Sequence, residues 1–160
     1  MIRAIKKTEV PECVKVIRES FLTVAKKFHF TVANAPRFGA FATNEERLYY
    51  QFEHENRPMY AYFENEKIVG YYSLAIQEDK KCELNNLCVL PEYRHRKIGE
   101  ELLMNSFEKA KELSCTKMSI GIVEENTVLR NWYEKNGFLH TGTKKFDFFP
   151  FTCGYLEKSL

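Results

Sequence analysis

Four consecutive basic residues, Arg94-His95-Arg96-Lys97, stand directly before a segment whose apolar spacing predicts a helix. The start of a helix carries roughly half a positive charge, so three certain cations there should destabilise it by about 0.3–1 kcal/mol each. A bound anion removes this conflict, because free backbone N–H groups, the helix dipole and basic side chains then act on one phosphate group. The pattern therefore predicts a pyrophosphate-binding turn. A solvated basic turn that binds nothing is the alternative.

The helix after this turn belongs to a predicted β-α-β unit. A stripe of apolar residues predicts the helix over residues 98–113, between strands at 82–90 and 117–123. Such a crossover favours parallel pairing of its two strands. The basic turn thus joins the end of a strand to the start of a helix.

Further strands and helices surround this unit. The sequence before it predicts, in order, a strand at 2–5, a helix over 14–24 with Thr8 as a capping residue, an aromatic loop at 28–43, a helix from a cap at Thr43 or Asn44 to about His54, and a hairpin of strands at 59–63 and 68–76. After the unit we expect a short helix at 127–136 that ends at Gly137, and strands at 138–146 and 151–156.

Composition bounds the class of protein. The chain has 160 residues and a formal net charge of +2, which gives no reason to expect a nucleic-acid partner. It is long enough for one domain, spanning residues 1–160. We find no apolar leader and no stretch of 18 apolar residues, so we expect a cytoplasmic protein without a membrane partner. Five scattered cysteines without a C-x-x-C pair predict reduced thiols and no metal site.

The basic turn also carries a resemblance to a known family. The order strand, Arg94-His95-Arg96-Lys97-Ile98-Gly99, helix resembles the Q/R-x-x-G-x-G/A signature of the GNAT superfamily of acyl-CoA-dependent N-acetyltransferases. A second family pattern follows as Asn126-x-x-Leu129-x-x-x-Tyr133-x-x-x-Gly137-Phe138. Lys97 departs from the signature, because the family usually has its first glycine there. The resemblance implies an α/β (α+β) fold, a mixed and mostly antiparallel sheet of about seven strands flanked by about four helices.

The resemblance implies acetyl-CoA as the cofactor. Backbone amides from Arg96 through Glu100 would cradle the CoA pyrophosphate, and main-chain groups of Leu87 and Val89 would pair with the pantetheine arm. The family often has a bulge here that splays two strands, and it places the N–H at the position of Leu87 against the acyl carbonyl. The expected cofactor-binding residues are Leu87, Cys88, Val89, Arg94, His95, Arg96, Lys97, Ile98, Gly99, Glu100, Asn126 and Tyr133.

Acyl transfer to an amine needs a base for the ammonium proton and an acid for the leaving thiolate. Glu83 and Tyr133 occupy the family positions for these roles. Period-two alternation puts residues 83, 85, 87 and 89 on one face, which would aim Glu83 at the acyl carbonyl, with Asn85 as an alternative that positions a water. Two structural interpretations stay open: a strand-end carboxylate in solvent or a salt bridge for Glu83, and a core side chain for Tyr133.

The acceptor is predicted less closely than the cofactor. The aromatic loop at 28–41, the helix carrying Glu45, Glu46, Glu53 and Glu55, and the loop at 147–150 would form the acceptor side. Aromatic walls and an acidic rim favour a small cationic primary amine, although a peptide N-terminus or a lysine also fits. The final strand could be an edge that pairs with a second copy to form a homodimer.

Three alternative functions are weighed against the enzyme. A non-catalytic sensor of CoA or a nucleotide would use the same basic turn without chemistry at Glu83 and Tyr133. A nucleic-acid-binding domain would use Arg94, Arg96 and Lys97, which the low net charge disfavours. A nucleophilic pair of Cys88 with His95 lacks a third orienting group.

Overall fold

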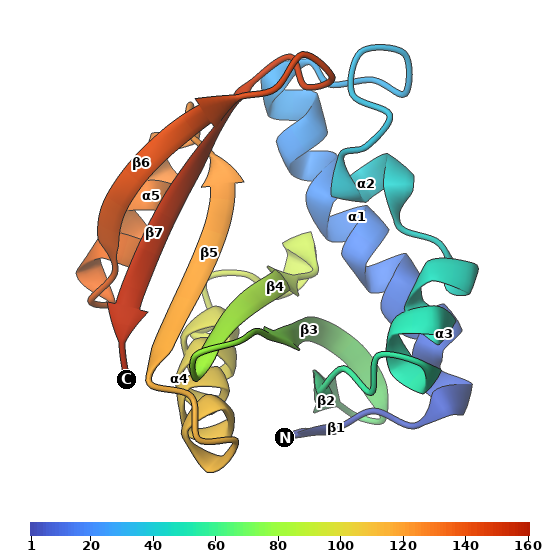
Figure 1. Ribbon diagram of the computed structural model, residues 1–160. Helices are drawn as coiled ribbons and strands as arrows, with labels where there is room; N and C mark the ends of the chain where they lie inside the picture. Colours follow the sequence, from blue (N-terminus) through green and yellow to red (C-terminus); the bar gives the residue numbers. More distant parts are fainter.

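A seven-stranded sheet forms the centre of the protein. The computed structural model describes all 160 residues. The strand order is β1-β2-β3-β4-β5-β7-β6 (Figure 1). Every neighbouring pair is antiparallel except the parallel pair β4 and β5, which confirms the predicted mixed, mostly antiparallel sheet and the crossover. The strands are β1 (Ile2–Ala4), β2 (Met59–Glu64), β3 (Lys67–Ile76), β4 (Lys81–Val89), β5 (Lys117–Val123), β6 (Leu139–Lys145) and β7 (Thr152–Ser159).

Helices cover both faces of this sheet. The first three lie together on one side and the last two on the other (Figure 1). They are α1 (Val10–Phe28), α2 (Gly39–Ala42), α3 (Glu45–Glu53), α4 (Ile98–Glu112) and α5 (Thr127–Lys135), with 3-10 turns η1 (Lys7–Glu9) and η2 (Pro91–Tyr93). The sequence analysis missed α2, because four residues are too few to show a helical period.

Burial of β3 explains why its sequence is almost continuously apolar. Both α1 and α4 contact β3 and β4. On the side of α4, the Tyr72 hydroxyl donates a hydrogen bond to Asn105 Oδ1 at 2.7 Å. On the side of α1, the Ile68 N–H donates to Glu12 Oε1 at 2.9 Å. Since successive strand residues point to opposite faces, a strand between two helices must be apolar on both.

The parallel pair β4–β5 comes apart after three residues. It spans only Lys81–Glu83 of β4 against Lys117–Ser119 of β5. On its other side, β4 carries an extra residue against β3 between Asn85 and Cys88, where Asn86 adopts a left-handed φ of 54°. This bulge bends β4, while β5 continues alongside β7 (Figure 1). The predicted bulge and splayed strands are thus present.

Two helix starts were predicted from capping residues, with different outcomes. Asn44 caps α3 as predicted, because its side chain accepts from the Arg47 N–H at 2.8 Å. Thr8 does not cap α1, which begins at Val10 behind the turn η1. Glu9 stabilises the start of η1 instead, since its carboxylate accepts a hydrogen bond from the Lys6 N–H at 2.7 Å and pairs with Arg3 at 2.6 Å.

The aromatic loop forms a second core and not an open aromatic pocket. Phe30 and Phe38 are buried with ring centroids 5.1 Å apart, and the Phe30 ring lies 4.9 Å from that of Phe151. Phe149 stacks on Phe151 from the loop that follows β6. This cluster joins the end of α1 to the start of β7. The phenylalanine rings are therefore core and not the aromatic walls expected of an acceptor site, whereas Arg37 of the same loop lines a separate cavity.

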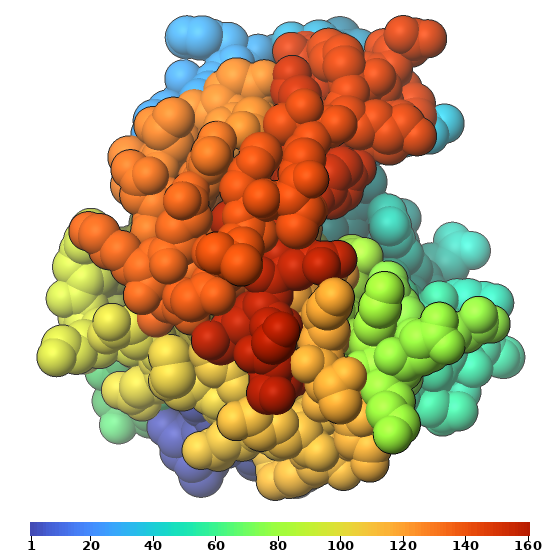
Figure 2. All heavy atoms as spheres, turned by 60° about the vertical axis from the view of Figure 1, so that its left-hand side comes forward, coloured from blue at the N-terminus to red at the C-terminus, as the bar shows by residue number.

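The edge strands of the sheet are β1 and β6, so the final strand, β7, is not an edge. β7 pairs with β5 on one side and with β6 on the other. Residues of β6 and β7 form the central and upper part of the surface facing the viewer in Figure 2. All five cysteines are free thiols, as predicted. None of the helices combines the length and the apolar character needed to cross a bilayer.

Candidate active site

A cavity of about 770 Å³ lies where β4 and β5 separate. It is bounded by α1, the end of β4, the turn before α4, and α5. Eleven of the twelve predicted cofactor residues line it, namely Leu87, Cys88, Val89, Arg94, His95, Lys97, Ile98, Gly99, Glu100, Asn126 and Tyr133. We call it the main pocket.

A run of free backbone amides lies at one end of the main pocket. None of the N–H groups of residues 95–100 donates a hydrogen bond within the protein. Helix starts always leave such donors, and here two of the six residues, His95 and Lys97, adopt left-handed φ values of 62° and 64°. Consecutive free amides at a helix N-terminus form an anion site. This geometry is the one that the basic turn predicts.

Arg94 does not supply a free cation to this site. Its guanidinium donates to the Val89 carbonyl, the Thr23 hydroxyl and the Ser20 carbonyl, each at 3.0 Å. Burial lowers the pKa of this guanidinium below its ordinary value. Arg94 therefore ties the turn to α1 and to the end of β4, which corrects the expectation that its charge acts on a phosphate group.

Arg96 also has another partner. Its guanidinium pairs with Glu64 at 2.9 Å and lies over the Tyr93 ring, outside the main pocket. Among the basic side chains lining the pocket, Lys97 and Lys27 are exposed and form no ion pair. The cations available to an anion are therefore Lys97 and Lys27, not three side chains of the turn.

The contribution of α1 escaped the sequence analysis. Ser20, Thr23 and Lys27 line the main pocket from α1, together with Phe21 and Val24. The prediction of this helix rested on the spacing of its apolar residues alone. The signal that was present is the polar set at residues 20, 23 and 27, which share one helical face.

Asn126 and Tyr133 each take the structural role that the sequence left open and also line the main pocket. Asn126 caps α5 by accepting from the Leu129 N–H at 3.3 Å, and it lines the pocket. Tyr133 is 6% exposed and packs on Trp132 and Phe138, with ring centroids 4.9 and 5.3 Å away. Its hydroxyl makes no hydrogen bond, and burial followed by the nearby Cys88 thiol raises its pKa above the usual 10. The phenol is therefore a protonated donor without a partner inside the pocket.

Cys88 is a buried thiol and not a nucleophile. Burial raises its pKa to about 12, so the thiolate is scarce at neutral pH. His95 is exposed on the turn and makes no hydrogen bond to it. No group of three His, Cys, Asp or Glu side chains comes together as a metal site.

Glu83 lies in a second pocket of about 380 Å³. It accepts a hydrogen bond from Asn85 Nδ2 at 2.5 Å, and Asn85 Oδ1 in turn accepts from Arg57 at 2.9 Å. Alternation predicted that Glu83 and Leu87 share a face, but the bulge places them on different ones. Glu83 and Asn85 line the second pocket, whereas Leu87 lines the main one.

The two pockets are neighbours across the bulge. A Cβ atom built on Gly39, in the second pocket, would lie 3.8 Å from Phe21 and 4.0 Å from Asn86 Oδ1. Phe21 belongs to the lining of the main pocket, and Asn86 is adjacent in sequence to Leu87. The arrangement can hold an anionic cofactor on one side of β4 and present a carboxylate from the other.

Comparisons with known proteins agree with this geometry. The profile of the Acetyltransferase (GNAT) family matches residues 26–138. A spermidine N(1)-acetyltransferase from Thermoplasma acidophilum is 33% identical over 86 residues, which are 54% of this chain and 53% of that protein. A putative [ribosomal protein bS18]-alanine N-acetyltransferase from Bacillus subtilis is 29% identical over 49% of this chain and 51% of that protein. The chain thus spans about half the length of these curated relatives.

Solved structures share the whole fold. The PaiA N-acetyltransferase from Thermoplasma acidophilum in complex with coenzyme A superimposes with a TM-score of 0.85 at 22% identity, covering 100% of this chain and 98% of that one. A ribosomal-protein-alanine N-acetyltransferase from Brucella melitensis gives a TM-score of 0.76 at 20% identity, covering 100% and 99%. Since the family profile spans most of the 160 residues, including the basic turn and α5, the chain belongs to the GNAT acetyltransferase family.

Proposed function

We propose that this protein is an N-acetyltransferase that moves acetyl from acetyl-CoA to an amine by direct attack. One observation carries the proposal: the main pocket combines six free backbone amides at the start of α4 with the unbonded hydroxyl of Tyr133. The first group fits a pyrophosphate and the second fits a leaving thiolate. The names of the two curated relatives support an amine as the acceptor.

Residues of the main pocket fit CoA along its length. The amides of residues 95–100 hold the pyrophosphate, and Lys97 and Lys27 neutralise its charge. Beyond Glu83, β4 has no strand on the side of β5, so its edge near Leu87 is free to pair with the pantetheine arm. Val89 contributes less than predicted, because its carbonyl already accepts from Arg94.

The chemistry assigned to this site is a single displacement. Glu83 takes the proton of the ammonium group, directly or through a water that Asn85 orients, and so leaves a neutral amine. The amine nitrogen then forms a bond to the thioester carbonyl carbon while the C–S bond breaks. The Leu87 N–H stabilises the carbonyl oxygen, and Tyr133 gives its proton to the departing sulfur. A raised phenol pKa keeps that proton in place at neutral pH.

The rival is a sensor of the same fold that binds CoA without turnover. Tyr133→Phe and Glu83→Gln separate the two, because an enzyme needs both groups in the transition state only. We expect about a 100-fold or larger loss of kcat in each variant, since general acid–base catalysis contributes 10²–10⁴-fold, with an unchanged Kd for CoA. Absence of thiol release from acetyl-CoA with every amine would favour the sensor.

Two smaller proposals accompany the reaction. The five free thiols are consistent with a reducing compartment, and we place the protein in the cytoplasm. If a homodimer forms through the sheet, β6 and not β7 provides the pairing edge.

A further inference from the structure

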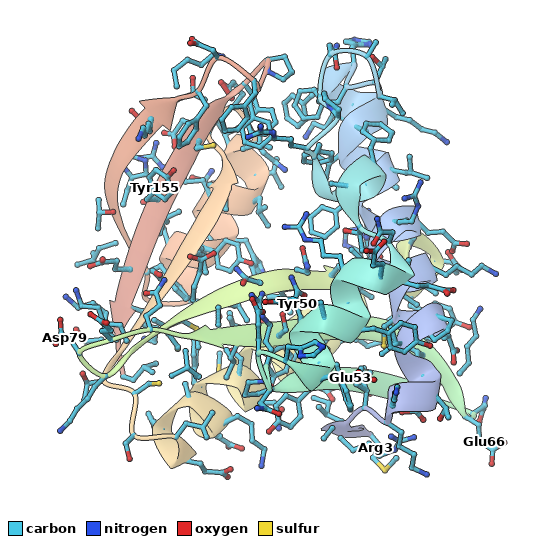
Figure 3. All side chains as sticks on the ribbon, turned by 45° about the vertical axis from the view of Figure 1, so that its right-hand side comes forward. Arg3, Tyr50, Glu53, Glu66, Asp79 and Tyr155 are labelled. Atoms are coloured by element: carbon cyan, nitrogen blue, oxygen red, sulfur yellow. The ribbon has the colours of Figure 1, made fainter.

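The second pocket is strongly basic. It lies between α3 and the bulged part of β4, and three arginines line it: Arg37, Arg47 and Arg57. Glu83 is the one carboxylate of its lining. Figure 3 shows α3, marked by Tyr50 and Glu53, in front of the sheet in that view. The glutamates of α3 do not line this pocket, so the predicted acidic rim is absent from it.

Two of these arginines have no anionic partner in the protein. Arg37 lies over the Phe148 ring at 4.1 Å, and its guanidinium makes no hydrogen bond or ion pair. The Arg47 guanidinium also makes none, although its backbone N–H caps α3. Both residues are exposed at the lining of the cavity. Unpaired guanidinium groups there favour an anionic occupant, because they offer planar, bidentate donors to carboxylate or phosphate.

The third arginine links this charge to the proposed base. Arg57 pairs with Glu55 at 2.9 Å and donates to Asn85, which holds Glu83. Gln51 adds a free hydrogen-bond acceptor. Its side chain lines the pocket and is 8% exposed, and its Oε1 atom has no hydrogen-bond partner. The pocket therefore offers cations and neutral polar groups beside the carboxylate that would receive the amine proton.

We infer that the acceptor is a small primary amine that also carries an anionic group, a carboxylate or a phosphate. Arg37 and Arg47 bind the anion while the amine lies near Glu83 at the bulge. A polycation would place positive charge against the two unpaired guanidinium groups and would bind poorly. This inference rests on the proposed acetyl transfer and reverses the preference for a cationic acceptor that the sequence suggested.

Binding to the protein–CoA complex tests the inference without requiring turnover. Calorimetry compares 4-aminobutanoate with butylamine, and O-phosphoethanolamine with ethanolamine, so that each pair differs by the anionic group alone. Spermidine serves as the cationic probe. The variants are Arg37→Gln and Arg47→Gln, with Arg47→Lys to retain the charge. Lys111→Gln is the matched control, because Lys111 is exposed on α4 and lines neither pocket.

We expect the member with the anionic group, in at least one pair, to bind about ten-fold or more tightly than the member without it, and the pair that responds identifies carboxylate or phosphate. Arg37→Gln and Arg47→Gln should remove most of this preference, Arg47→Lys should restore part of it, and Lys111→Gln should leave it unchanged. Equal binding within both pairs, tighter binding of spermidine, or a preference that survives both arginine variants would overturn the inference.

Thiol release from acetyl-CoA, measured with the same probes, separates this inference from the proposed function. Release with neutral or cationic amines, insensitive to Arg37→Gln and Arg47→Gln, would refute the anionic acceptor and leave acetyl transfer standing. Preferential binding of the anionic amines without any thiol release would support the basic pocket and refute acetyl transfer.

Discussion

Lys97 combines two unfavourable features at the start of α4. It adopts a left-handed φ of 64°, which costs a non-glycine residue about 1–2 kcal/mol, and it places a cation at the positive end of a helix. A lysine at this position is reasonable only if its charge serves an anion. If the proposed phosphate contact forms, the departure from the family signature exchanges stability for phosphate binding.

Replacing Lys97 separates these two effects. Lys97→Gly should be more stable than Lys97→Ala by about 1 kcal/mol, because only glycine relieves the left-handed backbone. Both variants lose the cation and should bind CoA several-fold more weakly than the unmodified protein. Urea unfolding and calorimetric titration measure the two quantities. Equal stability of the two variants would contradict the backbone argument, and unchanged affinity would contradict the role of the charge.

At the scale of elements, the close approach of β3 to α4 sets where the anion site lies. A Cβ atom on Gly70 would lie 2.7 Å from Leu102 Cδ1 and 3.2 Å from the Cys88 carbonyl oxygen. We expect Gly70→Ala to destabilise the protein by about 1–3 kcal/mol, as overpacking of a core does. Gly121→Ala is the control, because its Cβ would meet only the Tyr155 ring at 3.8 Å. Urea unfolding curves that coincide for the two variants would refute the close packing.

Elements that depend on local pattern were predictable from the sequence. The strand at 117–123 has the predicted bounds, and α4 differs from its prediction by one residue. The cofactor side was predictable too, because the amides of residues 95–100 are free for reasons local to one helix start. Periodicity and capping act over a few residues, so a sequence records them directly.

Features that depend on contacts distant in sequence were not predictable. Two of the three partners of Arg94 lie on α1, more than 70 residues away, and Glu64 on β2 pairs with Arg96. The bulge at Asn86 reverses the alternation that would have put Glu83 and Leu87 on one face. The aromatic residues that suggested a pocket are buried by Phe151, from the other end of the chain. In each case a tertiary contact decides between two structural roles that the local sequence allows equally.

At the scale of the whole molecule, buried cysteine thiols and tyrosine hydroxyls determine how stability responds to alkaline pH. Burial raises the pKa of Cys82 and of Cys88 from about 9 to about 12, and it raises the pKa of Tyr71, Tyr72 and Tyr133 above 10. The unfolded chain therefore releases these protons at a lower pH than the folded protein does. Stability should fall as pH rises from 9 toward 12, by roughly 1.4 kcal/mol per pH unit for each ionising thiol.

Thermal unfolding between pH 7 and 10.5, under reducing conditions, checks this dependence. Tm should be nearly constant up to about pH 8 and then fall. Cys88→Ala should reduce the slope above pH 9, because one of the responsible thiols is gone. A Tm that rises above pH 9, or a slope unaffected by Cys88→Ala, would show that these side chains are not buried as described.

The whole molecule is organised around one division of its sheet. The separation of β4 from β5 opens the main pocket, and the bulge in β4 turns Glu83 toward the second pocket beside it. CoA and the amine would thus meet at the same two or three residues of β4. The proposed acetyl transfer requires that CoA binds in the main pocket through the free amides of residues 95–100.

Calorimetric titration tests this claim most directly. CoA and ATP are each titrated into the unmodified protein and into Gly99→Ala. A Cβ atom on Gly99 would lie 3.8 Å from Trp132 and 3.9 Å from Val89, so the protein accommodates it. All three residues line the main pocket, so the methyl group would occupy space that we propose for CoA. We predict that CoA binds more tightly than ATP, and that Gly99→Ala weakens CoA binding about ten-fold or more without lowering Tm. Equal affinity for CoA and ATP, or unchanged CoA affinity in Gly99→Ala, would contradict the account.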